Sequence, residues 1–243
     1  MSSSFLDIFY LFFPYVSVSL FLILSIYRLI TWFRVPMDIK WPLSPTPKTN
    51  RGVVASILKE LVTFSSLYES DDIYWLAIIF LHFSLIFILL HVVSFLFNSM
   101  LAPDPISILR TTLYPATKDW LEIWTILIGF IAITSLLYIL LRRLLVKEVR
   151  EITFLRDYTE LVLLLVIFIL GTCMRLFNLV SMEEVVEYFL SLASLNPIKP
   201  PQNPIFLLHC LLAQLYIIYF PFSRCFHVIG YFINGWIVRK GVR

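Results

Sequence analysis

Five long runs of apolar residues constrain this chain more than any other feature. They cover about residues 8–32, 73–98, 120–141, 158–180 and 205–231. A helix of ~20 apolar residues crosses the ~30 Å hydrocarbon core of a bilayer. A single segment can satisfy all of its own backbone hydrogen bonds inside the bilayer only as a helix. The sequence therefore predicts an all-α membrane protein with five transmembrane helices, forming one membrane domain over residues 1–243.

Composition excludes a soluble globular domain, because 60% of the residues are hydrophobic and only 14% are charged. The net charge of +3 is too small to suggest a nucleic-acid partner. The opening residues MSSSFLD carry no positive charge before the first apolar run. We therefore expect no cleaved signal peptide, and we expect the first run to remain as a helix.

The basic residues indicate how the chain is oriented. They gather in alternate connections: Arg34, Lys40, Lys48, Arg51 and Lys59 after the first run, Arg142, Arg143, Lys147, Arg150 and Arg156 after the third, and Arg239, Lys240 and Arg243 in the tail. The loop after the second run has only Arg110 and Lys118. Because cytoplasmic loops are enriched in Lys and Arg, we predict an outside N-terminus and a cytoplasmic C-terminus in the cell (cytoplasmic) membrane.

The first of these connections, residues 34–72, is predicted to be cytoplasmic and to contain an amphipathic helix at about 52–68. Val53, Ile57 and Leu61 fall on one stripe of that helix. Two interpretations stay open. The helix lies along the membrane interface or against a partner, or it packs against the protein's own spans.

All four histidines lie inside two of the apolar runs: His82 and His91 in the second, His209 and His227 in the last. Ionisable groups inside a bilayer are costly and usually functional. We interpret them as axial ligands of two haems, with hydrogen bonding between helices or a proton relay as the alternatives. The three cysteines fit no zinc or iron–sulfur spacing, so we interpret them as packing residues.

Helical geometry supports this interpretation with one difficulty. His209 and His227 are 18 residues apart, which returns to the same helix face ~27 Å further on. His82 and His91 are nine apart, about 13–14 Å along the axis and ~180° around it. A local irregularity in the second run, or the reach of the imidazoles, is needed for both to face one partner. Pro221 can also kink the last run.

Antiparallel runs pair His91 with His209 near the outer face and His82 with His227 near the inner face. Haem propionates are anionic and require cationic partners. Arg224 lies three residues before His227 and is the inner candidate, while Arg175 at the end of the fourth run is the outer one. The alternative for both is snorkelling of a long side chain to the interface.

The stretch FLLH-x10-FPFSR-x2-H, from Phe206 to His227, resembles the last haem-binding helix of the nitrate reductase gamma subunit family, which are dihaem cytochromes b. GVVASILKELVTFSSLY, RDYTELVLLLVIF and GTCMRLF resemble the DsrM branch more closely. Members of that branch are cytochrome b subunits of DsrMK membrane complexes in sulfur-metabolising microbes. The resemblance extends over nearly the whole chain.

This resemblance implies two haem b groups and electron transfer between a menaquinone-type quinone and a cytoplasmic iron–sulfur subunit. That partner would resemble heterodisulfide reductase, in anaerobic sulfur or nitrate respiration, with further subunits in the complex. The chain would complete no reaction alone, so its status as an enzyme stays open. Near the outer ends, Lys118 is placed to bond a quinone oxygen and Asp119 or Glu122 to accept a proton. Alternatively, these three residues only cap the third span among the headgroups.

Two other functions remain. A haem-free anchor would only recruit a soluble redox subunit, and a small transporter would use the histidines as a proton relay. Transporters often contain broken helices or internal repeats, whereas this chain has only six glycines and no visible repeat. Haem content separates both alternatives from a cytochrome.

Overall fold

The computed structural model describes residues 5–34, 49–69, 71–100, 106–226 and 230–231. The long helices are α1 (Phe5–Arg34), α4 (Asp72–Met100), α5 (Ile106–Leu145), α7 (Leu155–Leu176) and α9 (Pro204–Tyr219). Each contains a segment that is long and apolar enough to cross a membrane. The prediction of five membrane-spanning helices in an all-α protein is confirmed.

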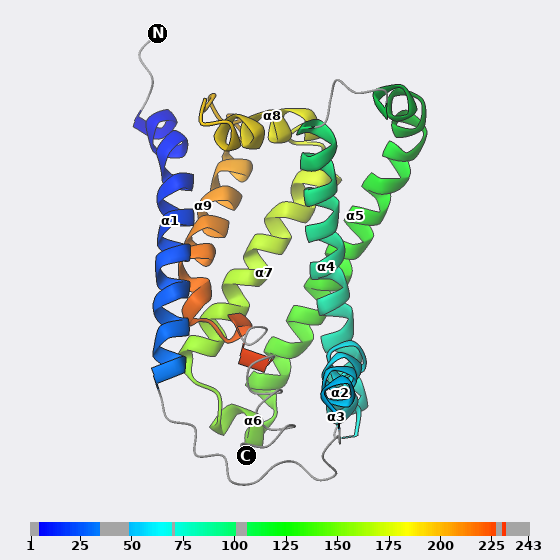
Figure 1. Ribbon diagram of the computed structural model, residues 1–243, viewed down its shortest axis with the longest axis vertical. Coiled ribbons are helices and arrows are strands. Elements are labelled where there is room, and N and C mark those ends of the chain that lie inside the picture. Colours follow the sequence, from blue (N-terminus) through cyan, green and yellow to red (C-terminus); the bar gives the residue numbers. More distant parts are fainter. Residues whose placement is uncertain (1–4, 35–48, 70, 101–105, 227–229, 232–243) are drawn as a thin grey trace.

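These five helices stand side by side in a row (Figure 1). α4 packs on α5, α5 on α7, α7 on α9, and α9 on α1. Short helices cover the two ends of the bundle. α8 (Met182–Ala193) lies at the end where the described chain begins, called here the α8 end. α2 (Asn50–Thr63), α3 (Ser65–Tyr68) and α6 (Lys147–Glu151) lie at the opposite, α6 end.

The outward surfaces of the long helices are apolar. Ile23 on α1 is 61% exposed and Leu89 on α4 is 63% exposed. Each square ångström of such surface costs ~25 cal/mol in water, whereas hydrocarbon chains accept it. Together with the length of the helices, this surface identifies a multi-pass membrane protein.

Between the helices, small residues permit close approach. Ala132 of α5 is fully buried among side chains of α4 and α7. A Cβ added to Gly129 would overlap the side chain of Thr172 on α7. The side chain of Thr172 thus packs directly on the backbone of α5, a close approach that small residues allow in membrane helices.

The predicted amphipathic helix at 52–68 is present but divided. α2 ends at Thr63 because Phe64 adopts a left-handed conformation (φ 47°), and α3 follows at once. Val53 and Ile57 are buried against the protein, while Val54, Leu58 and Val62 are exposed. One apolar stripe of α2 thus packs on the chain itself, and a second apolar stripe faces outward.

The last span differs from the prediction of one helix over 205–231. α9 stops at Tyr219, and two 3-10 turns follow, η1 (Phe220–Phe222) and η2 (Arg224–Phe226). Pro221 has no backbone N–H to continue the helix and its ring obstructs the preceding turn. Ser223 is then extended, with ψ 163°. The helix predicted to join His209 to His227 is therefore interrupted at Tyr219, and His227 itself lies outside the described residues.

The third predicted span also has a different start. α5 begins at Ile106 rather than near Trp120. Polar residues mark the end of an apolar run, but they do not prevent a helix from continuing beyond the hydrocarbon core.

Candidate functional site

His209 lies near the start of α9, and its ring packs on the backbone of α7. Asn203 caps α9 by accepting hydrogen bonds from the N–H groups of Ile205 and Phe206. The Nδ1 atom of His209 lies 3.0 Å from the carbonyl oxygen of Ile167. A carbonyl oxygen can only accept, so Nδ1 carries the hydrogen and Nε2 keeps its lone pair. This is the arrangement found in histidines that ligate a metal through Nε2.

Gly171 makes that contact possible. It lies one turn after Ile167 on α7, and a Cβ placed there would be 3.2 Å from Cε1 of His209 and 3.6 Å from Nδ1. Such a distance is tighter than ordinary van der Waals contact. The absence of a side chain at position 171 therefore lets the imidazole reach the carbonyl of Ile167.

His91 on α4 and His209 on α9 share a charged neighbour. Both imidazoles lie within electrostatic reach of the Arg175 guanidinium at the end of α7. Nη2 of Arg175 also lies 2.9 Å from Sδ of Met182, at the start of α8. In the described residues, α4 and α9 have no extended packing against each other. Two histidines from helices without extended packing against each other thus share one cationic neighbour.

α8 covers this end of the bundle. It packs on α4, and its buried Tyr188 contacts Phe206 of α9 and donates a hydrogen bond to the carbonyl of Tyr10, 2.6 Å away. Tyr10 in turn donates to the carbonyl of Leu207 at 2.9 Å. These contacts fix the start of α9, and with it His209.

His82 has the same tautomer as His209 but a different environment. Its Nδ1 lies 2.8 Å from the carbonyl of Ile78 in its own helix, so Nδ1 again carries the hydrogen. Its ring is 4.9 Å from that of Phe64, at the junction of α2 and α3. α4 is an uninterrupted α-helix, so the irregularity considered for the second span is absent from it. His82 and His91 therefore leave α4 on opposite sides.

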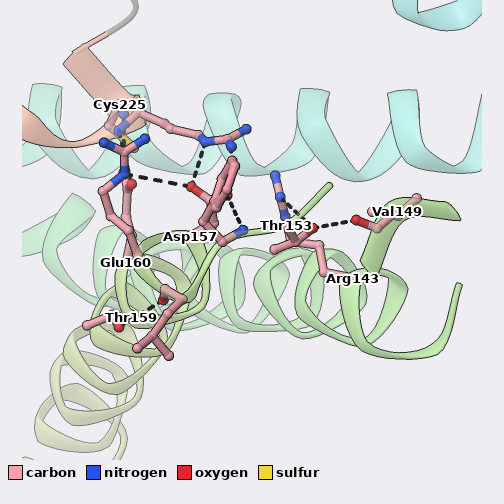
Figure 2. A network of polar contacts seen from close by, with 11 residues as sticks. Arg143, Val149, Thr153, Asp157, Thr159, Glu160 and Cys225 are labelled. Carbon is pink, nitrogen blue, oxygen red and sulfur yellow. Dashed lines mark hydrogen bonds and ion pairs between the residues drawn. The ribbon is translucent and has the colours of Figure 1, made fainter. Parts of the chain in front are cut away.

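His227 lies outside the described residues, but the chain just before it is well fixed. Arg224 forms an ion pair with Asp157 of α7 through two contacts, Nε to Oδ1 and Nη2 to Oδ2, each of 2.6 Å. Glu160, one turn further along α7, accepts hydrogen bonds from the backbone N–H groups of Arg224 and Cys225, at 3.0 and 3.1 Å. Figure 2 shows both acids pointing toward the segment after α9.

Sequence reasoning missed Asp157 and Glu160, although a signal was available. Both carboxylates occur at the beginning of an apolar span, three residues apart, and such residues are usually paired and functional. The structure buries both, with exposed fractions of 3% and 4%.

The remaining predicted residues are less informative. Glu122 is partly buried in α5, at the start of that helix's membrane-spanning segment. The side chains of Lys118 and Asp119 lie outside the described part of the structure. Within the described residues, no three His, Cys, Asp or Glu side chains gather as a metal site. A haem iron with two axial histidines needs only two protein ligands.

The fold and the site define a class of protein. It is a multi-pass membrane protein with five long helices, two of which lack extended packing against each other and each carry a histidine whose Nδ1 donates to a backbone carbonyl. The model of the family described as "Nitrate reductase gamma subunit" matches residues 61–241. The chain belongs to this family, and the family resemblance seen in the last span is confirmed.

Two curated relatives are similar over most of the chain. Both are described as "Hdr-like menaquinol oxidoreductase cytochrome b-like subunit". The protein from Archaeoglobus fulgidus is 28% identical, over 91% of this chain and 76% of its own length. The protein from Archaeoglobus profundus is 24% identical, over 89% of this chain and 74% of its own length. The narrower likeness to the DsrM branch stays a prediction.

Proposed function

We propose that this chain is the dihaem cytochrome b subunit of a membrane-bound menaquinol oxidoreductase. It would pass electrons between menaquinone and a cytoplasmic iron–sulfur subunit. The observation that carries the proposal is the oriented imidazole of His209, whose Nδ1 lies 3.0 Å from the carbonyl oxygen of Ile167. Arg175 is a cationic neighbour that His209 shares with His91. The names of the two relatives supply the quinol and support the cytochrome b class.

The first haem site is formed by His91 and His209. His209 supplies an oriented axial ligand, because its Nδ1 donates to the Ile167 carbonyl and its Nε2 keeps the lone pair. Arg175 supplies positive charge for a propionate. Haem, when bound, supplies reversible one-electron chemistry, and its potential is tuned by ligands, burial and neighbouring charge.

The second haem site is formed by His82 and His227. His82 carries its hydrogen on Nδ1, which contacts the Ile78 carbonyl, and its ring lies against Phe64 at the α6 end. Arg224 is the inner propionate candidate, and its guanidinium is already held by Asp157. Because His82 and His91 leave α4 on opposite sides, the two haems would not lie along one side of that helix.

The α6 end faces the cytoplasm in this proposal. It holds the basic residues Arg142, Arg143, Lys147, Arg150 and Arg156. An iron–sulfur subunit would dock at that end. Menaquinol would react near the α8 end, with Glu122, Asp119 and Lys118 as candidates for proton and oxygen contacts. The respiratory substrate, a sulfur compound or nitrate, is set by the partner subunits rather than by this chain.

The experiment is an optical titration of the purified protein, supplied with haem during expression. A reduced menaquinone analogue should produce the reduced b-type spectrum, with two haems per chain by quantitation. A His209→Ala variant should lose one haem. Leu208→Ala, which alters an exposed neighbour on the same turn of α9, should keep both. A folded wild-type protein without haem would instead support the haem-free anchor.

A further inference from the structure

The chain after α9 contains buried backbone groups that the helix no longer satisfies. The helix ends at Tyr219, so the N–H groups of Arg224 and Cys225 have no helical acceptors of their own. Glu160 accepts from both of them, one through each carboxylate oxygen (Figure 2). An unsatisfied buried N–H group is costly, so this one side chain determines where the segment lies.

A second acid holds the side chain of the same segment. Asp157 binds Arg224 through two contacts and also accepts a hydrogen bond from the backbone N–H of Phe154 at the start of α7. Charge-assisted, two-point contacts of this type are geometrically specific as well as strong. Asp157 and Glu160, called here the carboxylate pair, thus connect α7 to both the backbone and the side chain of Arg224.

The residue that follows is fixed from other directions. Phe226 is 2% exposed, and its ring centroid lies 5.5 Å from that of Trp32 on α1 and 5.8 Å from that of Phe220. The chain is therefore held by α7 and α1 up to the residue immediately before His227.

We propose that Glu160 and Asp157 are positioning residues for the haem ligand His227, with Glu160 the more important of the two. This inference rests on the proposed function, because it assumes that His227 binds haem. The carboxylate pair holds the segment that follows the end of α9, two to three residues before His227. The acids themselves touch no iron, and they act through Arg224 and Cys225.

Glu160→Gln tests the idea with a small change. Glutamine has the same length, but only one of its two terminal atoms can accept a hydrogen bond. One of the two N–H bonds is therefore lost. We expect the inner haem to be lost, or its midpoint potential and low-spin EPR signal to shift, while the outer haem keeps both properties. Glu160→Asp keeps two acceptor oxygens. Its inner-haem content, midpoint potential and EPR signal should therefore lie between those of Glu160→Gln and the wild type.

Glu151→Gln is the matched control, since it removes the charge of an exposed glutamate on α6. It should leave both haems unchanged. If Glu160→Gln retains two haems with wild-type potentials, the inference is wrong. Equal loss of both haems would also overturn it, because the effect would then be a general loss of folding. A wild-type protein without haem would refute the proposed function itself, which distinguishes the two failures.

Discussion

Two histidine rings, His82 and His209, donate through Nδ1 to backbone carbonyls. Each bond fixes the tautomer, with the hydrogen on Nδ1. The carbonyl that serves His209 belongs to another helix and is reached only because Gly171 has no side chain. Single residues on α7 thus decide how a ligand on α9 is presented.

Gly171→Ala tests that dependence. Alanine raises helix propensity by about 1 kcal/mol relative to glycine, so α7 itself should become more stable. The new methyl group should nevertheless displace the His209 ring and weaken haem binding at the outer site, by roughly 10- to 100-fold if the Ile167 bond is lost. Haem quantitation during haem titration measures this. Ile169→Ala, on the exposed side of α7, should bind haem normally, and equal binding by both variants would refute the role of Gly171.

Arg175→Gln tests the shared cation. A positive charge favours the reduced, less positive form of a nearby redox centre, so its removal should lower the midpoint potential of the outer haem. An effective dielectric of about 20 gives a change on the order of 1 kcal/mol, or a few tens of millivolts for one electron. Potentiometric titration of Arg175→Gln should show an unchanged midpoint potential for the inner haem. An Arg156→Gln variant should keep the wild-type midpoint potential of the outer haem. An unchanged outer potential would mean that Arg175 does not neighbour that site.

The helices themselves show how far sequence reasoning extends. Apolar length located all five spans, and α1, α4 and α7 begin within three residues of the prediction. Periodicity could not place the end of α9, because that end depends on Pro221 together with acceptors on a distant part of the chain, Asp157 and Glu160. The break in the amphipathic helix was equally hidden, since it depends on a left-handed Phe64 that packs on His82.

The histidine pairing shows the same limit. Spacing alone showed that His82 and His91 lie ~180° apart, but which neighbour each would meet depends on the packing of α2, α3 and α7. Arg175 was identified from its position in the chain, whereas its proximity to two histidines requires the three-dimensional structure.

The attachment of α2 and α3 to the bundle should depend on pH only in acid. Asp71 accepts from the N–H of Tyr74 and pairs with Arg142 at 2.8 Å, and these two contacts lower the pKa of its carboxyl. The ionised carboxylate of Asp71 therefore stabilises the attachment fully at pH values above its ordinary pKa, which is near 4. That stabilisation is lost as the pH falls through the lowered pKa.

Hydrogen exchange in α2 should therefore be the same from pH 6 to pH 8, after correction for the intrinsic rate. Asp71→Asn should increase it modestly throughout that range. Glu148→Gln on exposed α6 serves as the control. If wild-type α2 loosens between pH 6 and pH 8, Asp71 is not what holds it.

At the scale of the whole molecule, the two ends of the bundle differ in chemistry. The α6 end is basic and carries the connection between α5 and α7, while the α8 end carries an amphipathic helix and the Asp7–Lys199 ion pair at 2.7 Å. The positive-inside bias predicts that the α6 end is cytoplasmic. Electrons and protons would then be handled on opposite sides of the membrane.

Cysteine labelling tests the orientation. In cells, a membrane-impermeant maleimide should label Ser194→Cys, just after α8, and should label Lys147→Cys on α6 only after permeabilisation. Both positions are exposed. The wild-type protein provides the background from its own three cysteines. The reverse pattern would invert the membrane orientation and place the partner subunit at the other end.

The most direct test of the account is the haem content of His91→Ala, His209→Ala and the double variant. If the two histidines ligate one iron, each single variant should lose the same haem and the double variant should still retain one haem per chain. Loss of both haems in the double variant, with a different haem lost in each single variant, would contradict the account.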